Sequence, residues 1–272
     1  MRNLSCSPIE MIASPLRNRN LIREMTKREI VGRYRGSALG IIWSLFNPML
    51  LLAVYTFVFS VVFKARWGAD TGSKGEFAVI LFAGMIVYGL FAECLNHAPS
   101  LVLSHPNYVK KVVFPLEILP WVALGVALFH AAMSALVLVI FLLFLNQALP
   151  WTILLLPVVI TPLLLMTLGF TWFLSSLGVF LRDVSQLVGL LTTVLMFASP
   201  VFYSIASIPE QYRAFLYINP LAVLIEQVRG VLIWNVVPDL AVLTLVTGVS
   251  MLIAWIGFVF FQKTRSGFSD VM

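Results

Sequence analysis

The sequence predicts an all-α integral membrane protein with six transmembrane helices, and two observations support this fold class. First, 60% of its 272 residues are hydrophobic and only 11% are charged, whereas about a quarter of a soluble domain is charged. Second, the apolar residues fall into six long runs, and a helix needs roughly 20 apolar residues to cross the hydrocarbon core. Six such helices leave no room within the chain for a soluble domain of ordinary size.

The sequence divides into a cytoplasmic arm, residues 1–41, and a six-span transmembrane domain, residues 42–272. Pro157 and Pro162 lie inside the fourth apolar run and should kink that helix. Short polar stretches separate the third run from the fourth and the fourth from the fifth, so these helices should form tight hairpins. The predicted spans are residues 42–63, 77–97, 118–145, 151–179, 184–202 and 240–261.

The distribution of basic residues predicts the orientation in the membrane. Thirteen of the 18 Lys and Arg residues lie on one side of the predicted spans, eight of them in the arm. Cytoplasmic loops carry an excess of Lys and Arg, so both termini should be cytoplasmic. The net charge of +6 therefore reflects topology, not nucleic-acid binding. The two cysteines, Cys6 and Cys94, have no metal-site spacing and should not form a disulfide.

The arm should form an amphipathic helix over residues 16–34, followed by an elbow. An incomplete apolar stripe among many arginines is typical of a helix that lies on an anionic membrane surface. A solvated basic helix that obeys the positive-inside rule is the alternative. Gly32, Gly36 and Gly40 recur every four residues where the arm meets the first span, which favours a flexible elbow over a helix-packing motif.

Two segments between spans have unusual compositions. Residues 99–117, on the cytoplasmic side, should contain a short helix that Pro115 ends; the segment either docks onto another protein or is a plain connector. Residues 204–239, on the outer side, are too apolar for a free loop and are broken by Pro209, Pro220 and Pro238. They should form a re-entrant helical hairpin that covers a cavity, or two helices lying flat on the membrane.

Ionisable residues inside membrane spans are functional candidates by default. Glu93 and His97 lie four residues apart on one face of the second span. They either form a proton relay or metal site, or, as is more common, bond to a neighbouring helix or reach toward water. His130 in the third span is interpreted as a packing histidine. In the outer segment, Glu226 and Arg229 lie three residues apart and should pair.

The sequence has no phosphate-binding loop, serine-nucleophile motif or zinc-protease motif. Any energy for transport should therefore come from a partner chain. Aromatic residues are abundant, and flat aromatic faces suit the apolar faces of sugar rings, although lipid contact, packing or an interfacial belt would explain most of them. The candidates for an aromatic channel lining are Tyr55, Phe59, Phe63, Trp172, Phe197, Phe202 and Tyr203.

Three stretches together resemble one protein family. They are RYRGSALGIIWSLFNP at residues 33–48, VKKVVFPLEILP at 109–120, and FLRD at 180–183 with SPV at 199–201 and NP at 219–220. In their order and spacing they resemble the membrane subunit of ABC exporters of bacterial surface polysaccharide (O-antigen, capsule or teichoic acid). The resemblance implies a homodimer in the bacterial inner membrane, with two separate ATPase subunits that bind ATP and Mg²⁺ and a glycan carried on undecaprenyl pyrophosphate.

The resemblance also implies roles for particular residues. Residues 99–117 would couple to the ATPase, and residues 204–239 would form an outer gate. Arg33 and Arg35, at headgroup height, either hold the pyrophosphate or anchor the arm. The nearest rivals are a drug or lipid exporter permease, a membrane glycosyltransferase or ligase, and an ion-coupled flippase. The coupling residues would be Asn107, Tyr108, Lys110, Lys111 and Glu117, and the gate residues Pro209, Pro220, Glu226 and Arg229.

Overall fold

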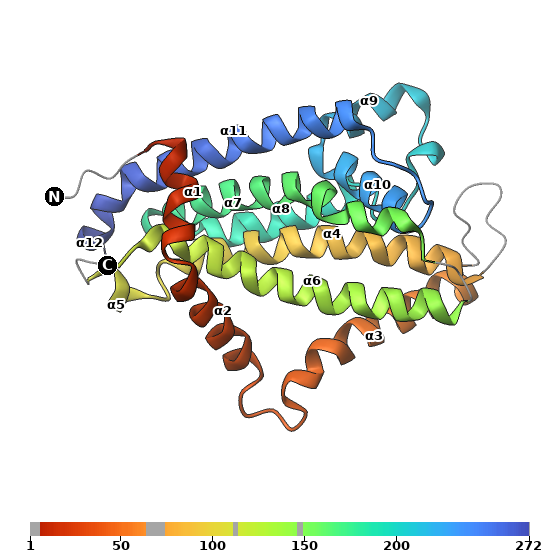
Figure 1. Cartoon of the computed structure of the whole chain (residues 1–272), viewed down its shortest axis with the longest axis horizontal. Helices are drawn as coiled ribbons and strands as arrows, with labels where there is room; N and C mark the ends of the chain where they lie inside the picture. Colours follow the sequence, from red (N-terminus) through yellow and green to blue (C-terminus); the bar gives the residue numbers. More distant parts are fainter. Residues whose placement is uncertain (1–5, 64–73, 111–113, 146–148, 272) are drawn as a thin grey trace.

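The computed structural model describes residues 6–63, 74–110, 114–145 and 149–271, and in these residues the regular elements are all helices (Figure 1). Five helical segments are long and apolar enough to cross a membrane, and a bent helix pair brings the number to six if it counts as one span. The predicted all-α membrane fold is confirmed. The five segments contain the helices α3 (Trp43–Tyr55), α4 (Lys74–Leu101), α6 (Leu119–Phe144), α7 (Leu156–Phe180) and α11 (Leu240–Thr264).

Helix α4 is the centre of the subunit. It packs against α6, α7, α8 (Val184–Ala198) and α10 (Pro220–Leu232). In its most apolar window, 78% of the residues are buried, compared with 17% in the span Gly40–Phe59. The first span is therefore the one that the rest of the subunit covers least.

Helices α7 and α11 touch through their main chains. A Cβ atom added to Gly257 would lie 2.0 Å from the carbonyl oxygen of Gly169, and one added to Gly169 would lie 2.6 Å from the carbonyl oxygen of Ile253. Small residues allow such close approach of membrane helices. Of the two prolines predicted to kink the fourth span, Pro157 lies in the first turn of α7, where a helix tolerates proline, and Pro162 lies inside the helix.

The arm and the first span form a V that points away from the body (Figure 1). The arm consists of α1 (Pro8–Arg17) and α2 (Arg19–Tyr34), with Asn18 between them, so the single helix predicted over residues 16–34 is divided. At the elbow, Gly36 and Gly40 have φ angles of +86° and +53°, which glycine adopts readily. A 3-10 turn (Gly40–Ile42) leads into α3, and a π-helical turn (Thr56–Val62) follows it.

The fifth predicted span is shorter than expected. Helix α8 has 15 residues and ends at Ala198, so it extends about 22 Å. Ser199 has φ −109° and ψ 150° because the proline that follows disfavours the helical conformation at this residue. The span predicted over residues 184–202 is therefore wrong at its end.

The segment predicted to form the outer hairpin contains two helices, α9 (Glu210–Ile218) and α10, bent by 97°. Pro209 precedes α9, and Pro220 begins α10, as is common for proline. Helix α10 is largely buried, whereas α9 exposes most of its large side chains. Along the long axis, α9 and α10 lie at one end, and α1, α5 (Pro106–Val109) and α12 (Phe268–Val271) lie at the other (Figure 1).

Candidate functional site

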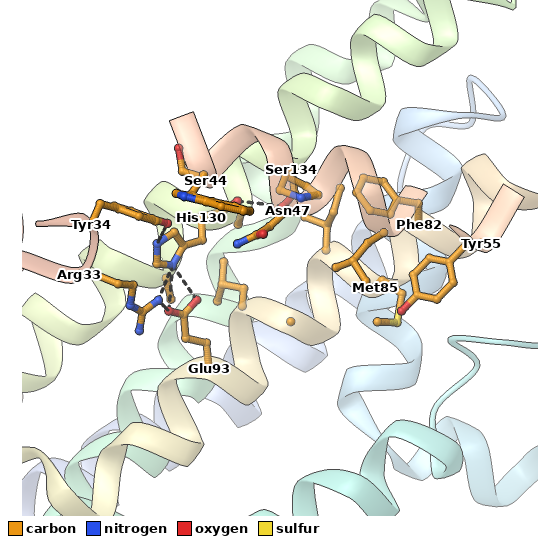
Figure 2. Close-up of a pocket in the computed structure, with 18 of the residues that line it drawn as sticks. Arg33, Tyr34, Ser44, Asn47, Tyr55, Phe82, Met85, Glu93, His130 and Ser134 are labelled. Atoms are coloured by element: carbon orange, nitrogen blue, oxygen red, sulfur yellow. Dashed lines mark hydrogen bonds and ion pairs between the residues drawn. The ribbon is translucent and has the colours of Figure 1, made fainter. Parts of the chain in front are cut away.

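A cavity of about 520 Å³ lies behind the elbow, between α2 and α3 on one side and α4 and α6 on the other. Figure 2 shows that its two ends differ in chemistry. Arg33, Glu93 and His130 gather at one end, and Tyr55 and Phe82 lie at the other. The cavity is within the size range of small-molecule sites, and its ends suit an amphiphile with a charged group.

An ion pair and a histidine hold the polar end together. The Arg33 Nη1 atom lies 2.7 Å from Glu93 Oε1, and His130 Nδ1 lies 2.8 Å from the same oxygen. The Tyr34 hydroxyl lies 3.1 Å from His130 Nε2. A neutral His130 that donates from Nδ1 to Glu93 and accepts from Tyr34 satisfies both contacts. The prediction that Glu93 bonds to a neighbouring helix is confirmed, and His130 has a polar partner in addition to its packing.

His97 lies on the other side of this ion pair. Its Nε2 atom lies 3.0 Å from Arg33 Nη2, and because arginine only donates, His97 accepts here. Arg33, Glu93 and His97 also line a second cavity of about 320 Å³, together with Glu29 and His105. The ion pair therefore forms part of the wall between the two cavities.

The two arginines predicted to bind pyrophosphate, Arg33 and Arg35, differ in whether their guanidinium groups already have partners. The guanidinium of Arg33 is occupied by Glu93 and His97, so an incoming anion must compete with a carboxylate. Arg35 follows α2, is exposed, and has no ion pair among the described residues. Burial raises the pKa of the neighbouring Tyr34 phenol, so Tyr34 remains a neutral hydrogen-bond donor at physiological pH. Arg35 is thus the arginine that is free to meet a ligand.

Six of the seven predicted lining aromatics form one cluster that extends from Tyr55, and of these six Tyr55 alone lines the cavity. Phe202 lies 5.8 Å from Phe197, and the Tyr203 hydroxyl donates to the Phe197 carbonyl at 3.0 Å. Phe197 and Phe63 are more than 60% exposed, so their faces are accessible. The Phe59 ring is central, with centroid distances of 5.4 to 6.4 Å to Tyr55, Phe63, Phe77 and Phe202.

Trp172 does not belong to this aromatic group, and its predicted place in a channel lining is wrong. Its side chain is 1% exposed and packs between Trp121 and Phe258 in the core. The indole N–H donates to the main-chain carbonyl of Glu117 at 3.0 Å. Trp172 therefore stabilises the junction of α7 with the segment that precedes α6.

The predicted coupling residues are partly exposed and partly internal. Asn107 and Lys110 are exposed on and just after α5, whereas Tyr108 stacks on Phe114 with a centroid distance of 4.2 Å. Lys111 lies outside the described residues. These positions leave α5 accessible to a partner at the end of the subunit that also carries α1 and α12.

Glu117 is not available to a partner chain, contrary to prediction. It is 8% exposed, and its two carboxylate oxygens contact Ser14 at 3.0 Å and Arg265 at 2.5 Å. Arg265 also donates to the Phe114 carbonyl at 2.6 Å. Glu117 thus joins α1, the coupling segment and the end of α11, and nothing in its local sequence indicates these distant partners.

Arg229 is a buried residue that holds the predicted outer gate to the rest of the subunit. Its side chain is fully buried and donates to the Ile80 carbonyl at 3.0 Å, to the Pro200 carbonyl at 2.5 Å and to the Val201 carbonyl at 2.8 Å. The predicted pair with Glu226 is confirmed, with 2.7 Å between Nη1 and Oε1. Arg229 therefore ties α10 to α4 and to the chain after α8.

Comparison with known proteins assigns the family. Residues 20–233 match the profile of the ABC-2 type transporter family, and this range includes the elbow, both cavities' walls on α4 and α6, and the bent helix pair. The chain belongs to the ABC-2 type transporter family. As a member of that family, it is a membrane-embedded transporter subunit built from several helical spans.

Three relatives are similar to this ABC-2 family member over most of their length. An O-antigen export system permease protein RfbA of Myxococcus xanthus is 26% identical over 264 residues, 96% of this chain and 99% of the relative. A protein of the same name from Klebsiella pneumoniae is 24% identical over 93% of this chain and 95% of the relative. The polysialic acid transport protein KpsM of Escherichia coli is 23% identical over 81% of this chain and 86% of its own length.

Proposed function

We propose that the chain is the membrane subunit of an ATP-driven exporter of lipid-linked polysaccharide, with O-antigen as the cargo. The relatives named for O-antigen and polysialic acid export support the cargo class. The observation that carries the proposal is the cavity behind the elbow, which has a polar end with the Arg33–Glu93 ion pair and an aromatic end. A glycan on undecaprenyl pyrophosphate has a charged group followed by sugar rings, and so matches this arrangement.

The lining residues, together with Arg35, which directly follows the lining residue Tyr34, and the aromatic cluster beyond Tyr55, supply a binding and sliding mechanism. Arg35 contacts the pyrophosphate first, because a guanidinium matches phosphate geometry and this one is unpaired in the described structure. Arg33 joins it when the phosphate displaces Glu93, which keeps its bond to His130. The sugar rings then move along the aromatic faces around Phe59, where binding is weak enough to permit release.

The proposal includes the assembly. Two copies form a homodimer in the bacterial inner membrane with both termini cytoplasmic, and two ATPase subunits bind ATP and Mg²⁺. The thinly covered first span leaves apolar surface for a second copy, since most of its large side chains are exposed. Asn107, Tyr108 and Lys110 face the ATPase, and residues 204–239 act as the outer gate.

Export by the purified complex tests the proposal. The chain is co-expressed with the ATPase encoded beside its gene, reconstituted in vesicles and supplied with lipid-linked glycan and ATP. We expect ATP-dependent translocation that Arg35→Lys lowers at least about tenfold, because a lysine cannot make the bidentate contact. Arg182→Lys is the matched control, since Arg182 is also exposed but lies in the turn after α7 and not at the elbow.

Three results would refute parts of this proposal. Translocation by the chain alone, without the ATPase, would exclude a partner-driven mechanism. Translocation of a drug or a phospholipid, but not of the glycan, would favour the rival class of exporter. Normal export by Arg35→Lys, in a complex that assembles normally, would move pyrophosphate recognition away from the elbow.

A further inference from the structure

A third cavity lies under the arm, separate from the two cavities beside Arg33. Its volume is about 350 Å³, and its walls come from α1 and α2 on one side and from α6, α7 and α11 on the other. Apolar side chains such as Leu16, Ile22 and Leu168 line most of it. The cavity shares no lining residue with the two cavities beside Arg33, so the proposed export mechanism makes no use of it.

Two arginines stand at the edge of this apolar space. Arg19 and Arg23 line the cavity and lie one helical turn apart on α2, so their side chains are neighbours. Both are exposed, and in the part of the chain that the structure describes neither has a carboxylate within ion-pair distance. By contrast, Arg17 on the same arm pairs with Glu10. The cavity edge therefore carries two uncompensated positive charges.

A tryptophan in the wall has an unused donor. Trp121 lines the cavity, and its buried indole N–H has no acceptor among the described residues. The neighbouring Trp172 also lines the cavity, but its N–H donates to a main-chain carbonyl. A buried donor without a partner is unfavourable, and an ester oxygen of an occupant would supply the missing acceptor.

The depth of the cavity suits an acyl chain. Leu168 and Trp172 lie 12 and 8 residues before the end of α7 at Phe180, so they are about 18 and 12 Å from that end. Arg19 and Arg23 are on the arm, which a helix of this composition would place at headgroup height. The cavity thus extends from an edge with two arginines to apolar side chains two to three helical turns inside the end of α7.

We propose that this cavity binds one acyl chain of an anionic phospholipid of the surrounding bilayer, whose phosphate contacts Arg19 and Arg23. Such binding differs from a general attraction of the basic arm to the membrane, because it requires these two arginines and the apolar space between the helices. The bound lipid fills the gap between the arm and the core and so fixes the arm against α6 and α7.

Native mass spectrometry of the full chain in mild detergent tests the site, because detergent removes the charged bilayer surface. The chain is incubated with phosphatidylglycerol or with phosphatidylcholine of the same acyl composition. We expect one retained phosphatidylglycerol per subunit. Arg19→Gln with Arg23→Gln should weaken its binding about 25-fold, since each basic residue at an anionic headgroup contributes roughly fivefold. Lys27→Gln with Arg28→Gln removes the same charge from α2 outside the cavity and should retain the lipid.

Two further measurements keep the test independent of folding defects in these variants. Leu16→Trp places a bulky side chain in the cavity from a position that is 66% exposed, so it should block phosphatidylglycerol binding without overpacking the core. Phosphatidylglycerol with brominated acyl chains should quench the tryptophan fluorescence of the unmodified chain more than that of Trp121→Phe.

Three outcomes would overturn the proposal. Equal retention of the two phospholipids would remove the role of the arginines. Equal losses in the Arg19/Arg23 and Lys27/Arg28 variants would show that only the overall charge of the arm matters. Displacement of phosphatidylglycerol by a polyprenyl phosphate at equimolar concentration would assign the cavity to a transported lipid instead of a bilayer lipid.

Discussion

Breaking the Arg33–Glu93 ion pair should loosen the elbow by an amount that can be measured. The pair connects the last turn of α2 to α4. Among the described residues, it is the ion pair that lies next to the elbow between the arm and the first span. Substituting both residues with Gln, singly and together, gives a double-mutant cycle that isolates the energy of this pair. The elbow should open more often in each single variant than in the unmodified chain.

The expected coupling energy is about 1.5 kcal/mol. Two charges about 4 Å apart attract by about 4 kcal/mol at an effective dielectric constant of about 20. The Arg33 side chain is 40% exposed and that of Glu93 is 21% exposed, so water reduces this value toward the roughly 0.2–1 kcal/mol of surface pairs. An energy of about 1.5 kcal/mol changes the opening equilibrium by roughly tenfold.

Hydrogen exchange of the amides in the last turn of α2 provides the assay, because exchange reports local opening free energies. The chain is measured in lipid nanodiscs for all four members of the cycle. The Arg17–Glu10 pair on α1 is the control, since its side chains are 62% and 27% exposed and its coupling should be below about 0.5 kcal/mol. A coupling for Arg33–Glu93 no larger than that of the control would refute the idea that this pair holds the elbow.

Three further predictions, two of them with a comparison variant, have defined outcomes. Arg229→Met should lower the free energy of unfolding by about 3–5 kcal/mol, because three main-chain carbonyls lose a buried donor, and Glu226→Gln should cost less; thermal unfolding in detergent measures both. Gly257→Ala should strongly destabilise the α7–α11 contact, whereas Gly248→Ala, with no atom within 4 Å of the added Cβ, should not; equal melting temperatures would contradict this packing. Tyr108→Ala should uncouple ATP hydrolysis from export in the assembled complex, and unchanged coupling would place the ATPase contact elsewhere.

The sequence predicts the fold well where lipid constrains it directly. Spanning segments must be helical and apolar because the hydrocarbon offers no hydrogen bonds to the main chain, and the long helices follow the predicted runs closely. The elbow is visible in the sequence because Gly36 and Gly40 need positive φ angles. The early end of α8 also had a local signal, since Pro200 restricts the residue before it.

The candidate site is less predictable because its partners are distant in sequence. Glu93 and His97 share a face by spacing alone, but Arg33 is 60 residues from Glu93 and His130 is 37 residues from it. Glu117 looks like a docking residue in its local context, yet Arg265, its partner, is 148 residues away. Tertiary packing decides these contacts, and neither helical periodicity nor composition contains that information.

The contact between Gly169 and Gly257 has a mechanical consequence for transport. With main chain against main chain, no side chain lies between α7 and α11 at this point, so we expect the two helices to tilt together. At the C-terminal end of α11, the Arg265–Glu117 ion pair connects this helix pair to the segment beside α5. At its other end, α11 begins just after the bent pair. A displacement of the segment beside α5 would therefore be transmitted along α7 and α11 to the bent pair at the other end of the subunit.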